Sequence, residues 1–219
     1  MKKIAVVLSG CGVNDGAEIH ESVVTLLAIK RNGAEYTCFA PDKPQYHVVD
    51  HVKGEPVKES RNVLTEAARI ARGDIKPLSA YKPADFDALV FPGGFGAAKN
   101  LFTFAIDGLD CSIDGQVKDA IMKTNAAGKP IGAMCIAPAL LAKAFEGSGK
   151  SITITIGQDD GVAGAVEKMG AKHEKRKVTE ACIDSANKIV TAPAYMINAD
   201  ISLVATGIEK LVEHVVKMS

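Results

Sequence analysis

Short runs of apolar residues alternate along the chain with longer segments in which apolar residues recur at helical spacing. The apolar runs lack the polar alternation of a half-exposed strand, so they fit a parallel sheet covered by helices on both faces. A chain that alternates strands and helices in this way folds as a three-layer α/β sandwich. The pattern predicts strands over 4–8, 36–40, 88–91, 130–134, 151–156 and 188–192, and helices over 19–32, 62–72, 114–127, 137–145, 162–169 and 199–216.

Length and charge narrow the class of protein further. The chain has 219 residues, enough for one domain with a large core, so we expect a single domain over 1–219. Its 26 Lys and Arg residues equal its 26 Asp and Glu residues, and no net field attracts nucleic acid or an anionic membrane. No apolar stretch reaches the roughly 18–20 residues of a membrane helix. The first apolar run ends at Ser9 without a cleavage site after it, which predicts a cytoplasmic protein.

The five cysteines, Cys11, Cys38, Cys111, Cys135 and Cys182, are scattered and odd in number. None pairs with another cysteine or a histidine at zinc-binding spacing, so we expect neither a disulfide framework nor a metal site. We expect no cofactor either.

The segment 41–61 interrupts the alternation of strands and helices. It is polar and contains three prolines, Pro41, Pro44 and Pro56. An insertion of this length on an α/β domain is a lid, a partner surface or a plain loop, and its pattern does not choose among them.

Cys135 follows a strand directly, and a helix begins two residues later with Pro138 in its first turn. This is the arrangement of a nucleophile elbow, in which small neighbours such as Gly132 and Ala137 relieve crowding. A thiol at a helix N-terminus meets the positive end of the helix dipole, which can lower the thiol pKa to about 3.5–7.5. A buried structural cysteine is the alternative, but the elbow context favours a reactive thiol.

The strand over 88–91 ends in Pro92-Gly93-Gly94. Such a turn either frees backbone N–H groups to form an oxyanion hole or simply connects the strand tightly to the next helix.

Glycines 10, 12 and 16 after the first strand suggest a dinucleotide fingerprint, but they are spaced G-x-G-x-x-x-G and we expect no nucleotide. Glu18, His20 and Glu21 follow at the start of the next helix. Alone, they could merely complement the helix dipole.

Residues 92–100 and the elbow over 132–138 together resemble the PfpI-like branch of the class I glutamine amidotransferase-like superfamily. The likeness extends to 8–21 and 191–196, and therefore to nearly the whole chain. It implies a flavodoxin-like three-layer sandwich, usually a homodimer, with Cys135 as nucleophile. It also implies a protonated glutamate hydrogen-bonded to the thiolate, which we assign to Glu21, with Glu18 as second choice. Two anions cannot share a dry pocket, so the carboxyl and the thiol would hold one proton between them.

The chain departs from the superfamily in its missing triad residues. No histidine follows the strand over 151–156, and His173 lies further on in a charged segment as a weak substitute. The C-terminal Pro-x-Glu of amidotransferases is replaced by Pro193-Ala194-Tyr195. Glutamine hydrolysis and proteolysis lose support, because an acyl-enzyme needs a base to activate water.

The resemblance favours a slow, cofactor-independent glyoxalase of the lyase class, which converts small α-oxoaldehydes such as glyoxal to glycolate. Cys135 would form a hemithioacetal, Glu21 would move a proton between adjacent carbons, and the amides of Gly94 and Ile136 would hold the oxyanion. The first alternative is a thiol-based redox sensor or partner-binding protein. A glutaminase subunit that feeds ammonia to a partner is the weaker alternative.

Overall fold

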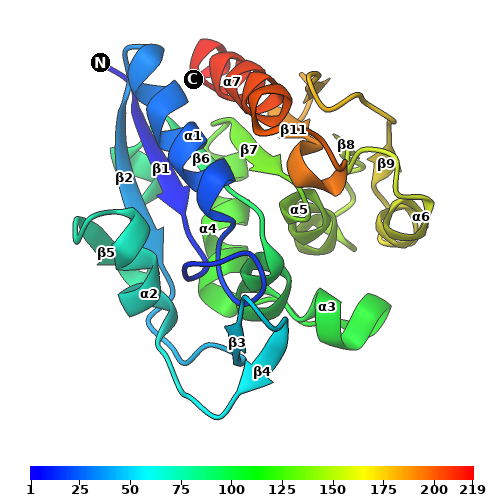
Figure 1. Cartoon of the computed structure of the whole chain (residues 1–219). Coiled ribbons are helices and arrows are strands. Elements are labelled where there is room, and N and C mark those ends of the chain that lie inside the picture. The colour runs from blue at the N-terminus through cyan, green and yellow to red at the C-terminus, as the bar shows by residue number, and fades with distance from the viewer.

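The computed structural model describes all 219 residues, and a twisted central sheet lies between two layers of helices (Figure 1). Seven strands form the sheet in the order β10-β11-β7-β6-β1-β2-β5, and only β10 runs antiparallel to its neighbour. The mostly parallel sandwich predicted from the sequence is therefore confirmed. The strands are β1 (Lys3–Val7), β2 (Glu35–Ala40), β5 (Ile75–Pro77), β6 (Ala88–Phe91), β7 (Ile131–Met134), β10 (Cys182–Asp184) and β11 (Ile189–Ala192).

Side chains alternate between two cores, one on each face of the sheet. In β1, Ile4 and Val6 enter one core while Ala5 and Val7 enter the other. The first core is covered by α1 (Ile19–Arg31), α2 (Val63–Ile70) and α7 (Ile201–Met218). The second is covered by α4 (Gly115–Ala126), α5 (Ala137–Phe145) and α6 (Asp160–Lys168), and the short helix α3 (Phe104–Asp107) lies beside it. No helix carries enough consecutive apolar residues to span a membrane.

The prediction that residues 151–156 form a strand of the main sheet is wrong. Only β8 (Thr153–Ile154) is extended there, and it pairs with β9 (Lys172–His173) in a separate small sheet. Two backbone N–H groups of this segment donate to side chains of the sheet instead of to a neighbouring strand. The N–H of Thr153 donates to the carboxylate of Asp184 in β10 at 2.8 Å, and the N–H of Thr155 donates to the hydroxyl of Thr191 in β11 at 2.8 Å. The antiparallel strand β10 holds the edge position instead.

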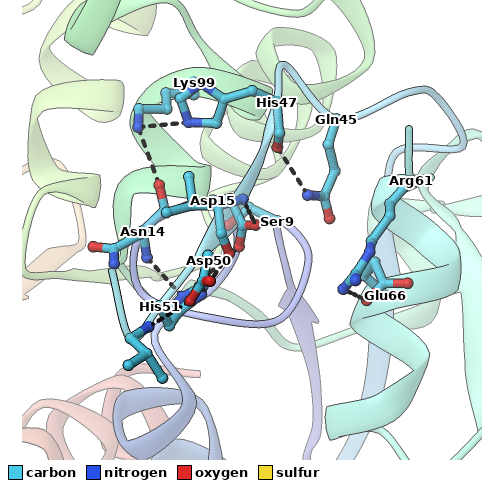
Figure 2. A network of polar contacts seen from close by, with 12 residues as sticks. Ser9, Asn14, Asp15, Gln45, His47, Asp50, His51, Arg61, Glu66 and Lys99 are labelled. Atoms are coloured by element: carbon cyan, nitrogen blue, oxygen red, sulfur yellow. Dashed lines mark hydrogen bonds and ion pairs between the residues drawn. The ribbon is translucent and has the colours of Figure 1, made fainter. Parts of the chain in front are cut away.

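The segment 41–61 forms a hairpin of β3 (Val48–Asp50) and β4 (Glu55–Val57) that is tied to the loop after β1 (Figures 1 and 2). The buried Asp15 carboxylate accepts the N–H of Val49 at 2.8 Å. Asn100 accepts the N–H of Tyr46 at 2.9 Å, and its amide donates to the carbonyls of Ser9 and Asp15. The insertion is therefore docked on the body by buried polar side chains.

Helix α7 passes unusually close to the segment that precedes β10. A Cβ on Gly207 would lie 2.1 Å from the carbonyl oxygen of Val178, so only glycine fits there. Gly164 in α6 lies in open space, with no atom within 4 Å of a Cβ built on it.

We expect Gly207→Ala to lower the free energy of unfolding by about 1–3 kcal/mol, because the methyl group forces the helix away from its neighbour. The matched change Gly164→Ala should raise it by about 1 kcal/mol, the gain of alanine over glycine in a helix. Urea denaturation measures both. Stabilisation by Gly207→Ala would contradict the close approach.

Candidate active site

Cys135 occupies a sharp turn between β7 and α5. Its φ is +60°, a left-handed conformation that costs a non-glycine residue about 1–3 kcal/mol. The N–H of Cys135 donates to the carbonyl of Ala192 at 3.0 Å, which fixes the turn to the end of β11. The thiol enters a cavity with only 8% of the residue exposed. The geometry is that of a nucleophile elbow.

Gly93, rather than Gly132, makes room for the elbow. A Cβ on Gly93 would lie 2.4 Å from the Cβ of Cys135. Gly132 faces α7 instead, where a Cβ would lie 3.0 Å from the side chains of Leu211 and Val215. The expectation that Gly132 relieves crowding at the elbow is therefore wrong, and its small size lets α7 approach the sheet.

Glu21 lies in the first turn of α1 and is completely buried. Its Oε2 accepts the N–H of Gly93 at 2.9 Å, its Oε1 accepts the N–H of Tyr195 at 3.3 Å, and the carboxyl also hydrogen-bonds the Cys135 thiol. Burial and, secondarily, the nearby Glu18 carboxylate raise the pKa of Glu21 to about 7, although its hydrogen bonds act in the opposite direction.

The pKa of the Cys135 thiol is also raised, first by burial and then by the charge of Glu21. The amides of Gly94 and Ile136 donate to the sulfur and oppose this shift. The sequence-based expectation of a lowered thiol pKa is thus wrong, since burial and Glu21 outweigh the helix N-terminus. The two acids form one unit that loses its first proton near pH 7 and its second at much higher pH. Between these points they share a single proton.

Glu18, the second choice from sequence, caps α1. Its Oε2 accepts the N–H of Glu21 at 2.7 Å, so the side chain caps the N-terminus of the helix. His20 is exposed and its Nδ1 lies 2.9 Å from the Tyr195 hydroxyl. His173, on β9, does not line the Cys135 cavity.

The Cys135 cavity has a volume of about 440 Å³ and mostly apolar walls. Gly94, with φ of +93°, directs its N–H to the sulfur, and a Cβ there would lie 2.4 Å from the backbone nitrogen of Glu18. No histidine lines the cavity, and its side chains come from Val13, Glu18, Phe95, Ala98, Phe104, Ala105, Cys135, Ile136, Asp159, Val162, Tyr195 and Met196. His, Cys, Asp and Glu side chains nowhere gather in threes at a spacing that would hold a metal ion.

Sequence reasoning missed two amides that hold Glu21. The N–H of Gly93 was visible as part of the Gly-Gly turn, although its acceptor was not. The contact between the N–H of Tyr195 and Glu21 has no signal in the local sequence, because the pairing of β11 with β7 is what brings Tyr195 to Glu21.

We expect the rate at which iodoacetamide alkylates Cys135 to rise with pH through an inflection near pH 7, where the pair loses its first proton. In Glu21→Gln only the thiol can lose that proton, so the inflection should move to higher pH and the plateau should rise. An unchanged profile in Glu21→Gln would show that the two groups are not coupled.

Cys135 should also be the first thiol to react, since two amides stabilise its thiolate. Cys11 is more exposed and burial raises its pKa as it does that of Cys135, but no amide donates to the Cys11 sulfur to stabilise a thiolate. Peptide mass spectrometry after brief labelling at neutral pH measures the order. Cys11→Ser is the control and should label at the wild-type rate, whereas earlier labelling of Cys11 or Cys182 would refute the assignment.

Known proteins resemble this chain over nearly its whole length. Rat "ES1 protein homolog, mitochondrial" is 48% identical over an aligned length of 227 residues. The alignment covers 99% of this chain and 84% of the rat protein. Human "glutamine amidotransferase-like class 1 domain-containing protein 3, mitochondrial" is also 48% identical, over 99% of this chain and 83% of its own.

Solved structures agree with these relatives. A crystal structure of an isoprenoid biosynthesis protein with an amidotransferase-like domain, from Ehrlichia chaffeensis, has a TM-score of 0.92 and 38% identity, covering 98% of this chain and 99% of its own. Drosophila melanogaster DJ-1beta, at 18% identity and a TM-score of 0.55 over 99% and 95% of the two chains, shares the fold. The DJ-1/PfpI family model matches residues 2–199. With this match and two relatives at 48% identity, the chain belongs to the DJ-1/PfpI family.

Proposed function

We propose that this protein is a cofactor-independent glyoxalase that converts glyoxal and similar small α-oxoaldehydes to hydroxy acids. One observation carries the proposal: a cysteine on a nucleophile elbow lines a mostly apolar cavity and lies against a completely buried glutamate whose pKa is raised to about 7. The pair supplies a nucleophile and a proton carrier at the same place, which an aldehyde isomerisation requires.

The reaction begins when the Cys135 sulfur adds to an aldehyde carbon, and the new oxyanion takes the proton that the pair holds. The amides of Gly94 and Ile136, which donate to the sulfur in the free protein, would also reach this oxygen. The Glu21 carboxylate then removes the hydrogen of the hemithioacetal carbon and returns it to the adjacent carbon through an enediol. Water hydrolyses the resulting thioester, so glyoxal and water become glycolate.

The sequence motifs support this choice among members of the family. They resemble ElbB, a bacterial protein described as a glyoxalase and tied by name to isoprenoid biosynthesis, and the Ehrlichia chaffeensis structure also carries isoprenoid biosynthesis in its name. The homodimer implied by the resemblance stays a prediction that sedimentation velocity would measure. The cytoplasmic location also stays a prediction, as the rat and human relatives are called mitochondrial.

A redox sensor is the second candidate, and the absence of a histidine from the cavity favours it. Without a second base, thioester hydrolysis is slow, and a reactive thiol adds to aldehydes whether or not catalysis is its task. The same amides of Gly94 and Ile136 would stabilise a sulfenate oxygen on Cys135. Glutamine hydrolysis has less support, because no histidine in the cavity can activate water.

We expect glyoxal turnover with a kcat/KM well below about 10⁴ M⁻¹s⁻¹, because no histidine lines the cavity to act as a base for the proton shift and for hydrolysis. Cys135→Ser should abolish turnover, and Glu21→Gln should lower it sharply while Cys135 still alkylates. Steady-state formation of glycolate, with methylglyoxal and glutamine run alongside, measures this.

Three outcomes discriminate the candidates. Unchanged turnover in Glu21→Gln would exclude its role in proton transfer. No turnover of either dicarbonyl, with rapid oxidation of Cys135 by peroxide, would favour the sensor. Release of ammonia from glutamine would favour the glutaminase.

A further inference from the structure

A second, smaller cavity adjoins the Cys135 cavity. It has a volume of about 190 Å³ and lies between the loop after β1, the β3–β4 hairpin and the turn after β6. The two cavities share Phe95 as a wall, and the neighbours Val13 and Asn14 line one each, as do Ala98 and Lys99. The second cavity is therefore a neighbour of the cavity that contains the reactive thiol.

The ammonium group of Lys99 lies in this second cavity and has only neutral partners (Figure 2). Its Nζ donates to the carbonyl of Asn14 at 3.0 Å and lies 3.0 Å from Nε2 of His47. It also lies 4.9 Å from the centre of the Phe95 ring. None of the ion pairs in the structure includes Lys99. A half-buried cation without a counter-ion is unfavourable, and an anion would compensate for it.

The buried carboxylate of Asp15 contacts other groups instead of Lys99. Asp15 accepts the N–H of Val49 through Oδ2, and its Oδ1 lies 3.9 Å from Nε2 of His51. Burial lowers the pKa of Lys99, and the Asp15 carboxylate opposes this shift through space. Asp15 thus favours the charged form of Lys99 without lining the cavity.

His47 lies beside the ammonium and lines the same cavity. Because its Nε2 accepts from Lys99, the ring is neutral and carries its proton on Nδ1, for which the chain offers no partner. Burial and the Lys99 cation both lower the pKa of His47, which keeps the ring in this state. The Lys99 ammonium uses two of its three N–H groups in its contacts with the Asn14 carbonyl and His47, and the third is free to donate to a small oxyanion in the cavity that His47 and Asn14 also line.

We propose that Lys99, with His47 and Asn14, forms a subsite for the carboxylate or phosphate group of an α-oxoaldehyde substrate whose carbonyl reacts at Cys135. This assignment of substrate class rests on the proposed glyoxalase function. It gives the β3–β4 hairpin a function, since the hairpin supplies His47 and part of the cavity wall. The competing explanation is that Lys99 only ties the hairpin to the loop after β1.

Direct binding to the full-length chain tests the subsite without relying on turnover. Isothermal titration calorimetry with inorganic phosphate, 2-phosphoglycolate and glycolate compares the two anion classes. We expect Lys99→Gln to weaken binding of the preferred anion at least about tenfold, the worth of one charged hydrogen bond. Lys99→Arg should restore most of it. Lys118→Gln, which removes an exposed lysine of α4, should bind as wild type does.

Protection of Cys135 links the subsite to the thiol. The preferred anion, 2-phosphoglycolate or glycolate, should slow iodoacetamide modification of wild-type Cys135 but have little effect on Lys99→Gln. If Lys99→Gln fails to fold, anion-induced shifts of the Asn14 and Gly54 amide resonances in the wild type serve as the test.

A series of substrates then tests the anion subsite and the glyoxalase function separately. Methylglyoxal, the phosphate ester of 3-hydroxymethylglyoxal and 3,4-dioxobutanoate share the reacting carbonyls, so preference for one anionic form should disappear in Lys99→Gln. Equal anion affinity in wild type and Lys99→Gln, or no binding below about 10 mM, would overturn the subsite. Anion binding that protects Cys135 without turnover of any α-oxoaldehyde would support the subsite and refute the glyoxalase.

Discussion

Two buried acids placed against each other tolerate only one negative charge between them, and the arrangement of this site follows from that constraint. Burial disfavours a charge on either Cys135 or Glu21, and each charge disfavours the other. Four backbone amides make a single negative charge tolerable: those of Gly93 and Tyr195 on the carboxyl, and those of Gly94 and Ile136 on the sulfur. Because amides carry no net charge and do not titrate, they stabilise the anion without fixing where the proton lies.

The sheet order brings these amides together. Strands β1, β6, β7 and β11 are four consecutive strands of the sheet, and the connections after them supply Glu21, the Gly93-Gly94 turn, Cys135 and Tyr195 in that order. The approach is so close that a Cβ on Gly93 would collide with Cys135 and one on Gly94 with the backbone of Glu18. Two glycines there are a steric requirement, and the same closeness brings their N–H groups within reach of both acids.

The sequence predicted features whose signal is local and missed those set by distant contacts. Uninterrupted apolar runs located β1, β2, β6, β7 and β11, and a strand running into Cys135 located the elbow. The edge strands β5 and β10 are too short to carry a pattern, and β8 is confined by side chains of its neighbours. The pKa of Cys135 was misjudged because the helix N-terminus is visible in the sequence, whereas complete burial and the position of Glu21 are properties of the fold.

The shared proton also orders the steps of the proposed reaction. Once the sulfur bonds to a carbonyl carbon it can no longer take a proton, so Glu21 titrates alone and loses the repulsion of an anionic neighbour. Its carboxylate is then held by the amides of Gly93 and Tyr195 against the cost of burial. No histidine lines the cavity, so in the proposed reaction a carboxylate serves as the base, and Glu21 is the one that contacts the thiol. Glu21 becomes a carboxylate again when it returns the proton of the hemithioacetal carbon to the adjacent carbon, so it can help to activate water only after the isomerisation is complete.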